Sequence, residues 1–176
     1  MPSGNHRRAG SSLLRALAGV ESGVIGGVFM LVWMALLSLL QGRSIWSIPN
    51  LLASTFYGEA ALRRGFRWTS LSGLALHLIM TAMAGVMFGL AVSGIASRSR
   101  VMLLGLASGM AWYFLWLGFF WKLMNPIVPV YGSGGGMLLA HLGLGYFLGS
   151  FPKYWSELKP ATSATPGLDA DTQYRP

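Results

Sequence analysis

Four long apolar runs alternate along the chain with short polar or basic segments. The runs cover approximately residues 20–40, 69–96, 101–121 and 135–151. A helix needs about 20 consecutive apolar residues to cross a bilayer, and the first three runs meet that length. The fourth run is shorter and would need local thinning of the bilayer. The pattern predicts an all-α, polytopic membrane protein built as a bundle of four transmembrane helices.

The connection between the first two runs, residues 41–68, is the longest and predicts one further helix. Residues from Leu51 to Arg64 have helical spacing. Aromatic side chains lie along this connection, and half-wet aromatic rings are typical of the membrane–water interface. We therefore expect a helix that lies on the membrane surface, or partly re-enters it, between spans 1 and 2. The aromatic residues are Trp46, Phe56, Tyr57 and Trp68.

The sequence predicts one structural unit followed by a tail. Residues 1–151 hold all four runs and form a single transmembrane bundle, as expected for a chain of 176 residues. Residues 152–176 are rich in Pro, Ser, Thr and Asp, a composition typical of a polar C-terminal tail.

The composition excludes an ordinary soluble domain. Hydrophobic residues make up 53% of the chain and charged residues only 10%, whereas about 25% of a typical soluble domain is charged. A soluble fold of this size could not bury so much apolar surface. The lipid bilayer is therefore the expected surrounding of the chain.

The net charge of +8 indicates membrane topology and not nucleic-acid binding. The basic residues lie in short stretches beside the apolar runs, where anionic headgroups attract them, and we expect no nucleic-acid partner. With four spans, most Lys and Arg fall on the side of the two termini, so the positive-inside rule predicts a multi-pass protein of a cell (inner) membrane with cytoplasmic termini. The terminal side carries Arg7, Arg8, Arg15, Arg98, Arg100, Lys153, Lys159 and Arg175, and the other side carries Arg43, Arg63, Arg64, Arg67 and Lys122.

The side chains that most enzymes need do not form a recognisable pattern. The chain has no cysteine, which excludes disulfides, cysteine-ligated iron–sulfur clusters, thiolate catalysis and c-type haem attachment. No nucleophile–base pair, metal-ligand cluster or phosphate-binding loop is evident. We therefore expect no catalytic residue, no metal site and no enzymatic activity.

Glycines recur at four-residue spacing in every predicted span. In lipid, helices associate through close backbone contact, which glycines at i and i+4 permit. The pattern favours a tightly self-packed bundle over contacts dedicated to oligomers. The glycines expected at helix contacts are Gly19, Gly23, Gly27, Gly85, Gly89, Gly105, Gly109, Gly145 and Gly149.

Two histidines lie within the predicted spans, His77 in the second and His141 in the fourth. Each is followed by a leucine and, eight residues on, by a glycine, so each shares the glycine face of its helix. Spans 2 and 4 run in the same direction. At 1.5 Å per residue both rings fall at comparable depth, about 12 and 9 Å into their spans. A histidine buried in a membrane is a candidate functional residue.

Three roles are open to this pair. Each ring could hydrogen-bond a backbone carbonyl or a hydroxyl such as that of Thr81 or Ser133. Alternatively, His77 and His141 could ligate a haem or a chlorophyll-type pigment, or they could handle protons or ions.

The leading functional hypothesis is a non-catalytic accessory or structural subunit of a larger membrane complex. It follows from the lack of catalytic side chains, the glycine-lined helix faces and the polar tails, which could dock on other membrane-protein subunits. The alternative is a b-type haem or pigment-binding electron-transfer protein that uses His77 and His141. A small-solute channel or transporter is a further alternative, which the charge-free spans neither support nor exclude.

Overall fold

The computed structural model describes residues 3–92, 94–95, 97–132 and 134–158, and this part of the chain contains helices and no strand. The elements in chain order are α1 (Ser3–Leu40), α2 (Ser47–Tyr57), the 3-10 helix η1 (Gly58–Leu62), α3 (Trp68–Ala91), α4 (Arg98–Leu115), the π-helical turn η2 (Trp116–Phe120), α5 (Trp121–Met124), α6 (Ile127–Gly132), α7 (Gly135–Gly149) and α8 (Phe151–Leu158).

The all-helical prediction is confirmed, and three segments are long and apolar enough to cross a membrane. They are Ser11–Leu40 within α1, Trp68–Ala91 in α3, and Arg98–Met124, which joins α4, η2 and α5. The fourth predicted run forms α7, which has 15 residues. At 1.5 Å per residue α7 is about 22 Å long, shorter than a hydrocarbon core of about 30 Å.

The first two long helices differ from the predicted runs in their bounds. α1 begins at Ser3 and not near residue 20, because no proline interrupts the polar segment that precedes the apolar run. α3 ends at Ala91, five residues before the predicted end. Gly94 follows with a φ of 148°, a backbone conformation that glycine adopts readily and that does not continue a helix.

The segment predicted as a polar tail begins with a helix. α8 buries Phe151 and Tyr154 and packs against α1. The apolar residues of α8 lie on one face of the helix, which packs against the bundle, and its polar residues lie on the opposite face. Residues 159–176 of the predicted tail lie outside the described residues.

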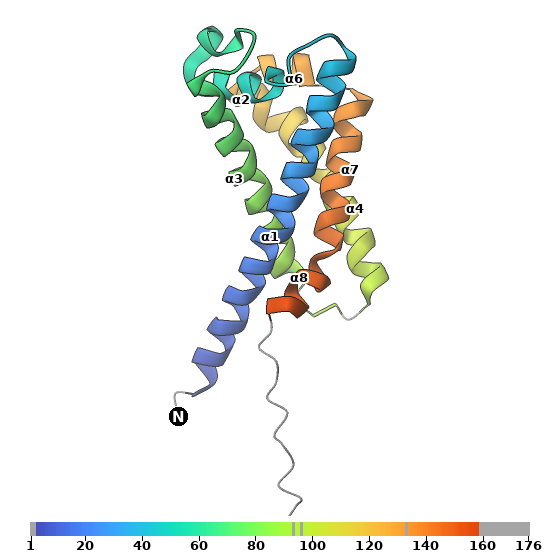
Figure 1. The fold of residues 1–176 in the computed structure, drawn as a ribbon. Helices are drawn as coiled ribbons and strands as arrows, with labels where there is room; N and C mark the ends of the chain where they lie inside the picture. The colour runs from blue at the N-terminus through green and yellow to red at the C-terminus, as the bar shows by residue number, and fades with distance from the viewer. Residues whose placement is uncertain (1–2, 93, 96, 133, 159–176) are drawn as a thin grey trace, which may run out of the picture.

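The long helices form two antiparallel hairpins. α1 packs against α3, α4 packs against α7, and α7 also packs along α1, which joins the two hairpins. In Figure 1, α1 and α4 rise toward the end of the molecule that holds α2 and α6, and α3 and α7 return from that end. The two helices that carry the histidines therefore run in the same direction.

Glycines lie where α1 crosses α3 and leave almost no space between the two backbones. A Cβ added to Gly19 would overlap the carbonyl oxygen of Gly85, and a Cβ added to Gly85 would overlap that of Gly19. A Cβ on Gly23 would overlap the carbonyl oxygen of Thr81, and one on Gly27 would overlap the Thr81 side chain. Such close approach is the means by which helices gain contact in lipid.

The hairpin of α4 and α7 is built in the same way. A Cβ on Gly105 would overlap backbone atoms of Gly145 and Gly149, and a Cβ on Gly109 would overlap the carbonyl oxygen of His141. Both hairpins are thus closed at backbone distance along their glycine faces. The last of the predicted glycines, Gly89, faces the Phe151 ring of α8.

The side chains of two asparagines form hydrogen bonds with the segments at the α2 end of the molecule. The Nδ2 of Asn50, in α2, donates to the carbonyl oxygens of Arg63 and Gly65 at 2.8 and 2.9 Å. The Nδ2 of Asn125, which follows α5, donates to the Ser54 hydroxyl of α2 at 2.8 Å. Because both amides are buried, these bonds satisfy groups that would otherwise be costly to remove from water.

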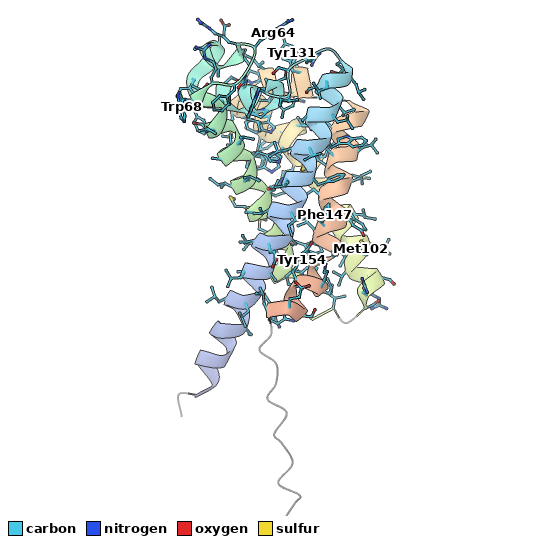
Figure 2. The ribbon with its side chains drawn as sticks, in the orientation of Figure 1. Arg64, Trp68, Met102, Tyr131, Phe147 and Tyr154 are labelled. Atoms are coloured by element: carbon cyan, nitrogen blue, oxygen red, sulfur yellow. The ribbon has the colours of Figure 1, made fainter. Side chains whose placement is uncertain are left out.

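Polar and aromatic side chains occupy the two ends of the bundle. Figure 2 shows Arg64, Trp68 and Tyr131 at the end that holds α2, and Tyr154 toward the opposite end. Between the ends, large apolar side chains such as Ile79 and Leu103 are exposed on the outer faces. This distribution is compatible with a bundle whose sides contact lipid.

Candidate functional site

A cavity of about 60 Å³ lies inside the bundle, where helices of both hairpins meet beneath α2 and α6. Its wall is mainly apolar and aromatic, and none of the described residues that form it is acidic. The residues that line it are Met30, Leu31, Met34, Ile48, Leu52, His77, Met80, Thr81, Trp112, Trp116, Leu117, Trp121, Val128, Met137 and His141.

His77 enters this cavity from α3. One of its ring nitrogens, Nε2, lies 3.0 Å from the carbonyl oxygen of Gly27 in α1. A carbonyl oxygen can only accept, so Nε2 carries the hydrogen and the neutral ring keeps its lone pair on Nδ1. Among the described residues, Nδ1 makes no hydrogen bond.

His141 enters the cavity from α7. Its Nδ1 donates to the carbonyl oxygen of Met137, one turn earlier in the same helix, at 2.8 Å. The neutral ring therefore keeps its lone pair on Nε2, which makes no hydrogen bond within the described part of the chain. The Tyr113 ring meets the imidazole edge-on, with the centroids 5.3 Å apart.

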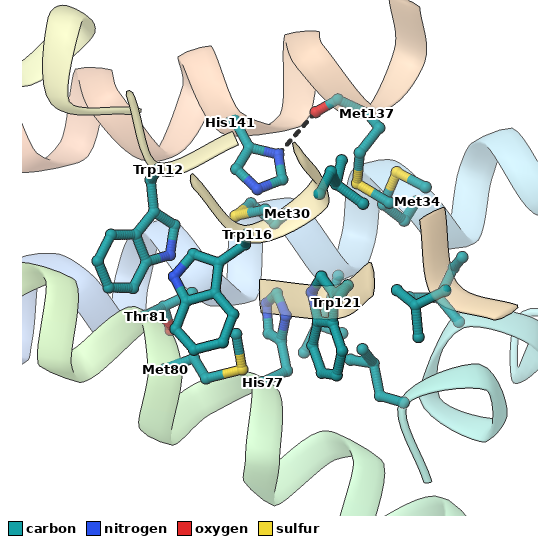
Figure 3. Close-up of a pocket in the computed structure, with 15 residues that line it drawn as sticks. Met30, Met34, His77, Met80, Thr81, Trp112, Trp116, Trp121, Met137 and His141 are labelled. Atoms are coloured by element: carbon teal, nitrogen blue, oxygen red, sulfur yellow. Dashed lines mark hydrogen bonds between the residues drawn. The ribbon is translucent and has the colours of Figure 1, made fainter. Parts of the chain in front are cut away.

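The structure brings the two predicted histidines together. They come from different hairpins, and Figure 3 shows their rings on opposite sides of the cavity, with Met30 between them in this view. Thr81 also lines the cavity, but its hydroxyl donates to the Leu78 carbonyl oxygen at 3.2 Å and not to a histidine. Ser133, the other hydroxyl considered, lies outside the described residues.

Four methionines share this cavity, and sequence reasoning missed them. Met30 and Met34 come from α1, Met80 from α3 and Met137 from α7. Their spacing is a signal that could have found them: Met30 and Met34 are four residues apart, Met80 follows His77 by three, and Met137 precedes His141 by four. Residues at these spacings lie on one face of a helix.

Three tryptophans close the side of the cavity formed by α4, η2 and α5. Trp112 and Trp116 are four residues apart, but Trp116 and Trp121 are five apart. The π-helical turn η2 absorbs this extra residue, because a π turn closes i→i+5 bonds. It therefore turns the Trp121 ring, in place of Phe120, toward the same wall. The indole Nε1 of Trp116 is buried and makes no hydrogen bond to any described residue.

The size of the cavity limits what it can hold. Pockets for drug-sized ligands are about 300–1,000 Å³, whereas one water molecule needs about 10–15 Å³. The cavity of about 60 Å³ therefore has room for an ion or a few water molecules. A haem or chlorophyll-type macrocycle between His77 and His141 would require the glycine-closed hairpins to move apart.

A metal ion could also be held by a cluster of His, Asp and Glu side chains. Within the described part of the chain, no three His, Asp or Glu side chains come together in a way that could hold a metal ion. Among the described residues that line the cavity, the two histidines are the only side chains with a nitrogen lone pair, since the indole N–H groups have none to offer a metal.

Comparisons of the chain with protein-family models, with curated proteins and with solved structures gave no match. Its function must therefore be inferred from the side chains and their geometry.

Proposed function

We propose that this chain is a non-catalytic integral membrane protein of four spans that binds a small ligand in the cavity between its two hairpins. The observation that carries this proposal is the pairing of His77 and His141. Each donates one ring nitrogen to a backbone carbonyl, and each keeps a second nitrogen without a hydrogen bond to the described chain.

The fourth span in this proposal is α7. It is short, but it packs against both α1 and α4 and so lies alongside two helices that are themselves long enough to cross a membrane. Its outward side chains are apolar or aromatic, with Leu139 and Tyr146 both more than half exposed. A bilayer that thins locally, or neighbours that shield its ends, would accommodate such a helix at modest cost.

The interfacial helix in this proposal is α2. Its middle residues, Pro49 to Ser54, are buried against the bundle, whereas Phe56 and Tyr57 near its end are exposed. A groove of about 460 Å³ beside α2 is lined by Arg43, Arg63 and Arg64. Guanidinium groups and half-exposed aromatic rings are typical of the headgroup region, where phosphates and water are both available.

A ligand in the cavity would satisfy polar atoms that the protein leaves unpaired. The free nitrogens of His77 and His141 are acceptors, and the Nε1–H of Trp116 is a donor without a partner in the described chain. Unpaired polar atoms in apolar surroundings are costly. Histidines at such a depth in a membrane are rare unless they have a function.

The test titrates the full chain in detergent micelles with Cu(I), Zn(II) and protohaem separately, with the thermal unfolding midpoint as readout. A ligand that binds the folded state alone raises this midpoint by mass action. We expect at least one probe to raise it, and expect the gain to be lost in His77→Leu and in His141→Leu but kept in His6→Leu. His77→Gln and His141→Gln serve in place of any leucine variant that fails to fold.

Two results would contradict the proposed ligand site. One is an unchanged midpoint with every probe, and the other is an increase that the cavity variants retain in full.

A second candidate function, an accessory subunit of a larger membrane complex, is favoured by the N-terminal part of α1. Arg15 of α1 contacts α8, at the end of the bundle opposite α2. Its guanidinium lies over the Trp155 ring, 5.4 Å from the centroid. Figure 1 shows α1 continuing past this end of the bundle. Leu13, on the projecting part, is 62% exposed. This exposed apolar side chain could contact a partner subunit as well as lipid, since Leu13 lies within the membrane-length segment Ser11–Leu40.

The subunit proposal is tested by the native mass of the protein extracted in mild detergent from its own membrane. We expect a native mass larger than that of one chain plus its bound detergent. In Leu13→Glu we expect this heavier complex to be absent. Leu123→Glu, a matched change at another exposed leucine, should leave it intact. A native mass equal to that of the lone chain would rule this role out.

A further inference from the structure

We propose that the cavity between the two hairpins is a binding site for one Cu(I) ion, held by the free nitrogens of His77 and His141 and by methionine sulfur atoms. The inference rests on the proposed function, because it names the ligand of the same cavity. Beyond the proposed function, it names the ion as Cu(I) and the ligand atoms as imidazole nitrogen and thioether sulfur.

The nitrogen and sulfur donors among the described lining residues, two imidazoles and four thioethers, are soft or intermediate, and the hydroxyl of Thr81 at the same wall donates to the Leu78 carbonyl oxygen. Thioether sulfur selects Cu(I), and imidazole nitrogen suits copper as well as zinc and iron. Zn(II) is bound in proteins by thiolate, imidazole and carboxylate, but the chain has no cysteine and the described cavity wall has no carboxylate. Two imidazoles and four thioethers, with no thiolate or carboxylate among the described lining residues, therefore favour a soft ion over zinc.

Both histidines are already oriented as metal ligands usually are. A histidine that binds a metal through one ring nitrogen almost always donates the other ring N–H to a carboxylate, a backbone carbonyl or water. His77 does so to Gly27 and His141 does so to Met137. These bonds fix the tautomer that leaves Nδ1 of His77 and Nε2 of His141 with their lone pairs. The first bond links α3 to α1, so the contact at the glycine face also positions this ligand.

The methionines at the cavity are a distinct subset of those in the chain. Of ten methionines, four line this one cavity. Others lie on the outer surface, such as Met83 and Met87 of α3, which are 51% and 59% exposed. Methionine also fills irregular gaps in apolar cores, and gap filling would be equally served by leucine. A Cu(I) site needs several thioethers beside imidazole nitrogens that make no other hydrogen bond. A gap in the core can be filled without them.

Charge and size also favour Cu(I) over a divalent ion. The cost of moving an ion from water to an apolar site is large and grows with its charge, and no acidic side chain among the described residues of the wall would offset a second positive charge. A cavity of about 60 Å³ accommodates a bare ion with direct ligands and little of a hydration shell. Trp112, Trp116 and Trp121 line the same cavity, and indole rings attract cations that lie over their faces.

The test is an anaerobic competition between the full chain, in detergent micelles, and a chromophoric Cu(I) chelator. We expect one equivalent of Cu(I) per chain, and X-ray absorption at the copper edge should show both nitrogen and sulfur neighbours. His77→Leu, His141→Leu, Met80→Leu and Met137→Leu should each weaken the affinity by at least about tenfold. Methionine-to-leucine changes conserve volume and are well tolerated in cores, so loss of Cu(I) affinity can be separated from loss of fold.

The matched controls are Met83→Leu and Met87→Leu, which remove thioethers from the outer face of the same helix. They should leave the Cu(I) affinity unchanged. Equal weakening by cavity and control variants would overturn the proposal, because it would assign the ion to surface sulfur atoms. Displacement of Cu(I) by equimolar Zn(II) would also overturn it, as would a chain that binds no Cu(I) and holds only water in the cavity.

The outcomes separate this inference from the proposed function. Binding of protohaem or Zn(II) without Cu(I), lost in the histidine variants, would keep the ligand site and refute the copper assignment. If none of the probes binds, both proposals fail.

Discussion

Gly19 and Gly85 face each other where α1 crosses α3, and a Cβ built on either residue would overlap the carbonyl oxygen of the other. The contact is backbone against backbone, so no side chain can rotate away to make room. It sets the distance between the helices that carry Gly27 and His77, and the hydrogen bond between those two residues depends on that distance.

Gly85→Ala should destabilise the bundle even though it adds a single methyl group. Overpacking costs typically about 1–3 kcal/mol, and a clash with backbone atoms leaves little means of relief. Gly118→Ala is the matched control, because Gly118 has no neighbouring atom within 4 Å of an added Cβ. We expect Gly118→Ala to be neutral or to stabilise by up to about 1 kcal/mol through helix propensity. Thermal unfolding in detergent compares the two, and similar midpoints would place this face of α3 against lipid.

Asn50→Ala should release the loop that follows η1. The mutation removes both donors to the Arg63 and Gly65 carbonyl oxygens and the Oδ1 atom that accepts from the Ser70 hydroxyl. Buried groups that lose their partners cost about 1–3 kcal/mol each. Trypsin cleavage after Arg63 and Arg64 should become faster.

The control for this loop is Ser72→Ala, which removes an exposed hydrogen bond to the Tyr57 hydroxyl. We expect trypsin to cut this variant at the wild-type rate. Unchanged cleavage of Asn50→Ala would mean that the loop is held by other contacts.

Trp33→Phe and Trp116→Phe remove the same indole N–H group, which has a hydrogen-bond acceptor in one case and none among the described residues in the other. The Nε1 of Trp33 donates to the Gly136 carbonyl oxygen at 2.9 Å, whereas the Nε1 of Trp116 has no partner among the described residues. Trp33→Phe should therefore cost about 1 kcal/mol more than Trp116→Phe in unfolding free energy. An equal cost, measured on ligand-free protein, would show that a water molecule in the cavity accepts the Trp116 hydrogen.

The topology proposal gives a direct expectation for reporter fusions. If the chain has four spans, most of its basic residues fall on the side of the termini, so a reporter fused after Pro176 should read cytoplasmic. A reporter inserted near Gly58, where η1 begins after α2, should read the opposite side. The same reading at both positions would be incompatible with an odd number of spans between them, and thus with four spans in total.

The all-helical class and the helices long and apolar enough to cross a membrane were predictable from the sequence, because both depend on local properties. A run of apolar residues makes a helix long enough to span a bilayer whatever its neighbours are. The spacing of glycines likewise places them on one helix face. The shorter α7 and the helix α8 were harder to predict, because their lengths and caps depend on the loops and on the helices they pack against.

The grouping of the cavity residues was decided by tertiary structure. The sequence placed His77 and His141 at similar depth on parallel helices, and it could not assign the Gly27 carbonyl oxygen as partner of His77, because that contact joins residues 50 positions apart. Nor did it identify the four methionines or Trp121 as neighbours in one cavity, because helices of both hairpins contribute them and the π turn of η2 precedes Trp121. Hydropathy and periodicity describe each helix alone. The ligands that face one another depend on which helices are neighbours and on their register, and glycine contacts between backbones fix that register here.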